Sequence, residues 1–141
     1  MSKKASAVWK GGIKDGGGTI STESGALKAA PYGFKSRFEN GAGTNPEELI
    51  AAAHAGCFSM AFSLMLGEAG FTPEKIETQA AVTLVSNTDG FKITSSHLTV
   101  TAKIPGIDNA KFKQIAEQAK AGCPISKVLN TTITMDATLK A

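Results

Sequence analysis

Apolar and polar residues alternate in three stretches of the second half of the chain, at residues 76–84, 91–104 and 133–139. A period of two predicts β-strands that bury one face. In the middle stretch the apolar residues change from odd to even positions, which predicts a β-bulge near Ser95-Ser96. Turn residues join the first two stretches, so we expect these strands to pair in the antiparallel sense.

A long helix is predicted in the middle of the chain. Residues 49–66 are almost entirely apolar, and Pro46 stands just before them. Proline fits the first turn of a helix because its missing N–H needs no partner there, and Thr44 or Asn45 can begin a capping box. We expect this helix to continue as far as residue 67 or 70.

The remaining patterns predict shorter elements. Residues 5–13 and 19–22 flank a glycine-rich turn typical of a β-hairpin, and we expect residues 34–38 to be extended. A helix of period 3.6 should end at Gly122, and Cys123-Pro124 should begin a short third one. The order of elements indicates an α+β fold with antiparallel sheets around a long central helix.

Composition is that of one soluble domain over residues 1–141, with a net charge of +3 and scattered lysines. No basic stripe indicates nucleic acid, and no spacing of Cys and His indicates a metal site. The start of the chain is too polar for a secretory signal, so we expect a cytoplasmic protein. Glutamates flank residues 49–66 and no cluster of Lys or Arg marks an inner end, which argues against a membrane span.

A helix that is apolar on every side must be covered on every side, and one small sheet cannot do this. The simplest cover is a second copy of the chain. We therefore expect an intertwined homodimer.

The chain has two cysteines, Cys57 and Cys123, and each ends the same tripeptide, Ala-Gly-Cys. Cysteines in a reducing compartment are often buried small hydrophobic residues, and that interpretation stays open. The alternative is a redox-active thiol pair. A reactive thiol needs positive charge or a helix N-terminus nearby. Of the two cysteines, only Cys123 is expected to stand at a helix N-terminus.

Arg37 is the only arginine among fifteen basic side chains. A guanidinium remains charged at physiological pH and can hold a carboxylate with two bonds. Glu47, in the first turn of the long helix, is a candidate partner, although it can equally serve as a capping residue. About 15 Å of helix separates Glu47 from Cys57. Either that helix is broken, or Arg37 and Glu47 of one subunit reach Cys57 of the other.

His54 precedes Cys57 by one helical turn, which raises the alternative of a Cys–His thiol hydrolase or acyltransferase. A hydrogen-bonded core histidine is the simpler interpretation. A third possibility is a non-catalytic ligand-binding dimer with cysteines that only fill the core.

Two segments resemble a known family. Residues 43–60, GTNPEELIAAAHAGCFSM, are similar to the signature of the OsmC family, the osmotically inducible relatives of the organic hydroperoxide resistance proteins. Residues 119–126, AKAGCPIS, are similar to the second-cysteine motif of that family. The similarity extends over essentially the whole chain and is closer to the OsmC branch.

This resemblance implies a two-cysteine hydroperoxide peroxidase on a swapped α+β dimer, with active sites at the subunit interface and no cofactor. By position, Cys57 matches the peroxidatic cysteine, Cys123 the resolving one, and Arg37 and Glu47 the pair that activates the thiolate. The Cys57 thiolate would become a sulfenic acid, and Cys123 would convert it to a disulfide. The resemblance also implies an external dithiol reductant of the lipoyl type. Apolar residues such as Met60, Phe62 and Ile125 would favour organic hydroperoxides.

Overall fold

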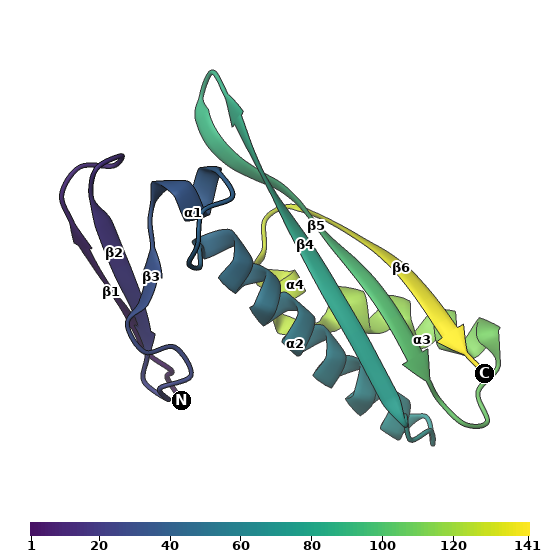
Figure 1. Cartoon of the computed structure of the whole chain (residues 1–141). Helices are drawn as coiled ribbons and strands as arrows, with labels where there is room; N and C mark the ends of the chain where they lie inside the picture. Colours follow the sequence, from purple (N-terminus) through teal and green to yellow (C-terminus); the bar gives the residue numbers. More distant parts are fainter. The chain divides into compact units, whose positions relative to one another are not determined.

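The computed structural model describes all 141 residues and divides into two compact units, Met1–Leu49 and Ile50–Ala141. Together they hold two three-stranded sheets and four helices (Figure 1). The elements in chain order are β1 (Ala5–Lys10), β2 (Gly17–Thr22), β3 (Ala30–Tyr32), α1 (Phe34–Phe38), α2 (Pro46–Glu68), β4 (Lys75–Asn87), β5 (Gly90–Lys103), α3 (Asn109–Gly122), α4 (Pro124–Val128) and β6 (Thr132–Lys140). The predicted α+β class is confirmed, and the extent of one domain over residues 1–141 stays a prediction.

The first unit is built on the antiparallel sheet β1-β2-β3, which includes the predicted hairpin. Gly18 of β2 lies beneath the ring contact between Trp9 and Tyr32, whose centroids are 5.5 Å apart. A Cβ atom at Gly18 would lie 2.6 Å from the Tyr32 ring and 2.6 Å from the Val8 carbonyl oxygen. Only glycine therefore allows these two rings to meet over the sheet.

The expectation of an extended segment at residues 34–38 is wrong, because this segment is helix α1. The Gly33 N–H donates to the Ser36 hydroxyl over 2.9 Å, and the Arg37 N–H donates to the Gly33 carbonyl over 3.1 Å. These local bonds close a helical turn. Helical spacing also brings the rings of Phe34 and Phe38 to 5.1 Å, an i,i+4 pair that the strand interpretation overlooked.

Helix α2 begins and ends where the sequence predicted. Asn45 provides the cap, since its Oδ1 accepts a 2.8 Å bond from the Glu48 N–H. The Glu48 carboxylate accepts a 2.7 Å bond from the Thr44 hydroxyl instead of closing a reciprocal box with Asn45. The helix is unbroken from Pro46 to Glu68, and its length and composition alone would allow it to cross a membrane.

The second unit is built on the sheet β4-β5-β6, in which β5 pairs antiparallel with β4 and parallel with β6. The expectation of antiparallel pairing is therefore wrong for β6, because α3 and α4 form a crossover connection that returns the chain in the same direction as β5. Thr83 pairs with Ser95 and Leu84 with Ile93, so the predicted bulge lies at Thr94, one residue from the expected place. It allows β5 to change which positions face the core.

Helices α2 and α3 pack on one face of this sheet, as the buried residues show. Phe62 of α2 and Phe112 of α3 place their ring centroids 5.7 Å apart. The fully or nearly buried apolar residues are Phe58, Phe62, Leu66, Leu98, Val100, Ala102, Ile104, Phe112, Ile115, Ala116, Ala119, Cys123 and Ala137. The core of the second unit thus includes one of the two cysteines.

Candidate active site

The structure brings the two cysteines together in the second unit. Cys57 lies on α2 and is partly exposed, whereas Cys123 is fully buried where α3 meets α4. Both thiols are free, and their side chains are in hydrogen-bonding contact. Two residues 66 positions apart in the chain are therefore neighbours in the second unit.

A tight corner between α3 and α4 places Cys123. Gly122 ends α3, and a Cβ atom there would lie 3.0 Å from the Cε atom of Met65 on α2. The Cys123 N–H still donates to the Ala119 carbonyl of α3, while Pro124 begins α4. Cys123 thus ends one helix and begins the next, as the Gly-Cys-Pro order predicted.

The surroundings of Cys57 in this unit disfavour the thiolate. Burial raises the pKa of the Cys57 thiol above its ordinary value, and the hydrogen bond with Cys123 raises it further. The backbone N–H of Ile125 on α4 acts in the opposite direction and lowers the Cys57 pKa. Because the thiolate is the reactive form, the second unit positions Cys57 without activating it.

His54 is fully buried, as the core interpretation predicted, and both of its ring nitrogens are in use. Nδ1 lies 2.7 Å from the Ser96 hydroxyl of β5, and Nε2 lies 2.8 Å from the Ser126 hydroxyl of α4. Burial lowers the pKa of His54, so the ring is neutral near pH 7. With both nitrogens occupied by serines, the ring is not a base for Cys57, which removes the basis for the hydrolase alternative.

The first unit holds the other two predicted residues, Arg37 on α1 and Glu47 in the first turn of α2. Arg37 donates from Nε over 3.2 Å and from Nη2 over 2.9 Å, and both bonds reach the Oε1 atom of Glu47. The expected carboxylate partner is therefore present, although one oxygen accepts both bonds. Glu47 is 7% exposed, and its buried Oε2 accepts no hydrogen bond from the protein. An acceptor of this kind is costly to leave without a donor.

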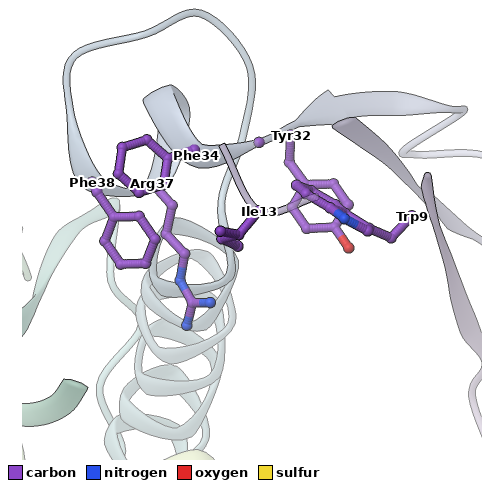
Figure 2. A pocket seen from close by; sticks show the side chains of 7 residues that line it. Trp9, Ile13, Tyr32, Phe34, Arg37 and Phe38 are labelled. Carbon is purple, nitrogen blue, oxygen red and sulfur yellow. The ribbon is translucent and has the colours of Figure 1, made fainter. Parts of the chain in front are cut away.

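An aromatic pocket that the sequence analysis missed lies beside Arg37 (Figure 2). Its volume is about 280 Å³, and it is lined by Trp9, Ile13, Tyr32, Gly33, Phe34, Arg37 and Phe38. The Arg37 guanidinium lies 5.3 Å from the Phe38 ring centroid. The pocket combines an apolar wall with one cation, and it contains the only tryptophan and the only tyrosine of the chain.

The four predicted residues thus form two pairs, one in each unit. The three apolar residues expected around the thiols have different surroundings. Met60 is 77% exposed and Ile125 packs against the core. Phe62 is fully buried between Phe58 and Phe112, and the influence of these apolar residues on the choice of peroxide stays a prediction.

Comparison with known proteins identifies the family. Residues 39–138 match the family model described as OsmC-like protein. The chain is 58% identical over 139 residues to the protein named peroxiredoxin OsmC of Escherichia coli strain K12, covering 99% of this chain and 97% of that one. It is 28% identical over 124 residues to organic hydroperoxide resistance protein OhrB of Bacillus subtilis strain 168, covering 87% and 89%.

Solved structures agree. The crystal structure of OhrB from Bacillus subtilis superposes with a TM-score of 0.68 and 26% identity, over 97% of this chain and 98% of that one. An OsmC-like protein of Mycoplasma pneumoniae reaches a TM-score of 0.77 at 17% identity, over 100% and 99%, and so shares the fold. The chain belongs to the OsmC-like family, and the predicted resemblance is confirmed.

Proposed function

We propose that this chain is a thiol-dependent peroxidase that reduces organic hydroperoxides to alcohols through Cys57 and Cys123. The observation that carries the proposal is the contact between the two free thiols. Membership of a family whose 58% identical relative is named a peroxiredoxin supports the reaction class.

The chemistry follows from which sulfur can be reached. The partly exposed Cys57 attacks the terminal oxygen of ROOH as a thiolate, the O–O bond breaks, and ROH leaves after taking up a proton. Cys57 is then a sulfenic acid. The buried thiol of Cys123 attacks this sulfur, which forms the disulfide and releases water. An external dithiol reduces the disulfide, and a lipoyl-type dithiol is the class that the family resemblance favours.

Within its own unit, burial and Cys123 raise the pKa of Cys57 more than the Ile125 N–H lowers it, so the activating group is sought outside that unit. We assign activation to the Arg37 guanidinium, oriented by Glu47. Since α2 is unbroken, about 15 Å of helix separates Glu47 from Cys57. The pair in one subunit therefore serves the thiol of the other subunit in a homodimer.

The exposed side of α2 supports this dimer. Met60 and Leu64 are 77% and 65% exposed on a helix whose opposite side is buried. Such large apolar side chains on one helix face are typical of a surface that another chain covers. The expected cover on all sides is thus absent from the single chain, and a second copy provides it. A cytoplasmic location fits the two free thiols.

The aromatic pocket provides the substrate preference. Its walls bind the apolar part of a hydroperoxide, and the Arg37 cation directs the polar end. Hydrogen peroxide has no apolar part to bury there. Cumene hydroperoxide should therefore react faster than hydrogen peroxide, and the reverse order would contradict this preference.

The test is a single turnover without reductant. One equivalent of cumene hydroperoxide should remove both free thiols and lower the intact mass by two hydrogen atoms per chain. The Cys123→Ser variant should instead stop at a Cys57 sulfenic acid that dimedone traps. Two thiols unchanged after prolonged exposure would mean that the cysteines only fill the core, as in a non-catalytic dimer.

A further inference from the structure

His54 has no part in the peroxide chemistry described above, yet it is a fully buried titratable side chain one turn from Cys57. A buried imidazole needs partners for both nitrogens, because an unsatisfied polar atom in a core is costly. Ser96 and Ser126 meet this need at 2.7 and 2.8 Å. In the neutral ring one nitrogen donates to a serine oxygen and the other accepts from a serine hydroxyl.

The two serines belong to different elements. Ser96 is fully buried in the central strand β5, so its bond holds the imidazole against the sheet. Ser126 is in the first turn of α4, so its bond connects that helix to α2. His54 therefore joins a rigid strand to a short helix.

Helix α4 has few other attachments. It has five residues, none of them fully buried, and no side chain caps its first turn. Lys127 and Val128 face solvent, while Ile125 packs against the core. A helix this short is held by its tertiary contacts and not by its own backbone bonds. The bond from Ser126 to His54 is the one hydrogen bond between side chains that holds α4.

The same turn of α4 touches both His54 and Cys57. Cys123, at its start, contacts the Cys57 thiol, and the Ile125 N–H bonds to the Cys57 sulfur. Ser126 bonds to His54. His54 and Cys57, one turn apart on α2, thus contact three of the four successive residues 123–126. Any movement of α4 away from His54 therefore also moves the Cys123 thiol.

We propose that His54 is a positioning residue for disulfide formation: through Ser126 it holds α4 so that Cys123 stays in line with the Cys57 sulfenic acid. This inference rests on the proposed peroxidase function. In the step concerned, the Cys123 sulfur attacks the Cys57 sulfur, the S–S bond forms as the S–O bond breaks, and the hydroxyl leaves as water with the Cys123 proton. The sulfurs must approach to about 2.05 Å in a narrow range of angles, so a small displacement of α4 slows the reaction.

Slower disulfide formation has a measurable chemical consequence. A sulfenic acid that is not converted quickly to the disulfide can react with a second ROOH, which gives a sulfinic acid and a second ROH. The fraction of Cys57 converted to sulfinic acid at a given peroxide concentration therefore measures the rate of the second oxidation relative to the rate of disulfide formation.

The test uses Ser126→Ala with Ser59→Ala as a matched control. Both substitutions remove a half-buried serine hydroxyl bound to another side chain. Ser59 bonds to Thr78 of β4 over 2.7 Å and donates to the Ala55 carbonyl, and neither bond involves α4. Sulfenic acid and disulfide are followed by rapid quenching, dimedone trapping and intact mass, and the sulfinic fraction is titrated with cumene hydroperoxide.

Ser126→Ala should form the disulfide about fivefold more slowly, with a sulfinic fraction raised by a similar factor, and the oxidation rate of Cys57 should change by less than the rate of disulfide formation. Ser126→Thr, which keeps a hydroxyl, should restore most of the rate, and Ser59→Ala should resolve as the unmodified chain does. The positioning role assigned to His54 would be overturned if Ser126→Ala forms the disulfide at the unmodified rate, or if Ser59→Ala slows disulfide formation equally. If the unmodified chain forms no sulfenic acid at all, the peroxidase proposal itself fails.

Discussion

The two units of the chain differ in what they contribute to chemistry. Ile50–Ala141 contains the core and both thiols in contact, but it raises the pKa of Cys57. Met1–Leu49 contains the Arg37–Glu47 pair and an aromatic pocket, but no cysteine. In the proposed mechanism, disulfide formation therefore belongs to one unit, and activation and substrate preference belong to the other. Substitutions should separate these contributions.

The largest effect is expected from Cys57→Ser, which removes the nucleophile. Turnover of cumene hydroperoxide with a dithiol should fall to the uncatalysed background. The measurement is peroxide consumption with dihydrolipoamide as reductant. Cys123→Ser is the comparison, since it should retain one fast oxidation per chain. Sustained turnover in Cys57→Ser would show that this cysteine is not the nucleophile.

Arg37→Lys should show the next largest effect. The charge is retained, but the planar group that donates two bonds to Glu47 is lost. We expect oxidation of Cys57 to slow by about tenfold or more, as measured by stopped-flow loss of peroxide in a single turnover. Disulfide formation after the sulfenic acid should be unaffected, because Cys123 and α4 lie in the other unit. Oxidation at the unmodified rate would contradict the role assigned to the guanidinium.

The pH dependence should separate the two units further. Without activation, the raised pKa of Cys57 leaves little thiolate at neutral pH, so the oxidation rate should rise about tenfold per pH unit up to that pKa. We expect this steep rise, continuing above the usual thiol value of about 8.5, in Arg37→Gln. The unmodified chain should reach its plateau at a lower pH. Oxidation rates between pH 6 and 10 provide the comparison, and coincident profiles would mean that Arg37 does not lower the Cys57 pKa.

A smaller effect is expected from Trp9→Ala, which removes part of the pocket wall. The rate with cumene hydroperoxide should fall by about three- to tenfold, because apolar contact area is lost. The rate with hydrogen peroxide should stay within about twofold, which makes it an internal control. An equal loss with both peroxides would show that the pocket has no part in selecting the substrate.

Much of the fold and part of the candidate site could be predicted from the sequence, wherever the pattern of residues is periodic or involves close neighbours in the chain. The strands of the second unit, the extent of α2 and the placement of Cys123 at the start of α4 follow from alternation, capping and the Gly-Cys-Pro order. Helix α1 could not be read in this way, because one bond between Gly33 and Ser36 decides its conformation. The aromatic pocket was missed because its residues come from separate elements, from Trp9 of β1 to Phe38 of α1.

The proposed mechanism places activation and thiol chemistry in different units that meet across a subunit boundary. Its most direct test mixes subunits that carry Arg37→Gln with subunits that carry Cys57→Ser, and isolates the mixed dimer through two affinity tags. At neutral pH the Cys57→Ser dimer should be inactive and the Arg37→Gln dimer far slower than the unmodified chain. If Arg37 of one subunit serves Cys57 of the other, the mixed dimer has one intact site and should show about half of the unmodified activity. The reciprocal dimer, with both substitutions on one chain, should then be inactive. An inactive first dimer and a half-active reciprocal dimer would contradict the account.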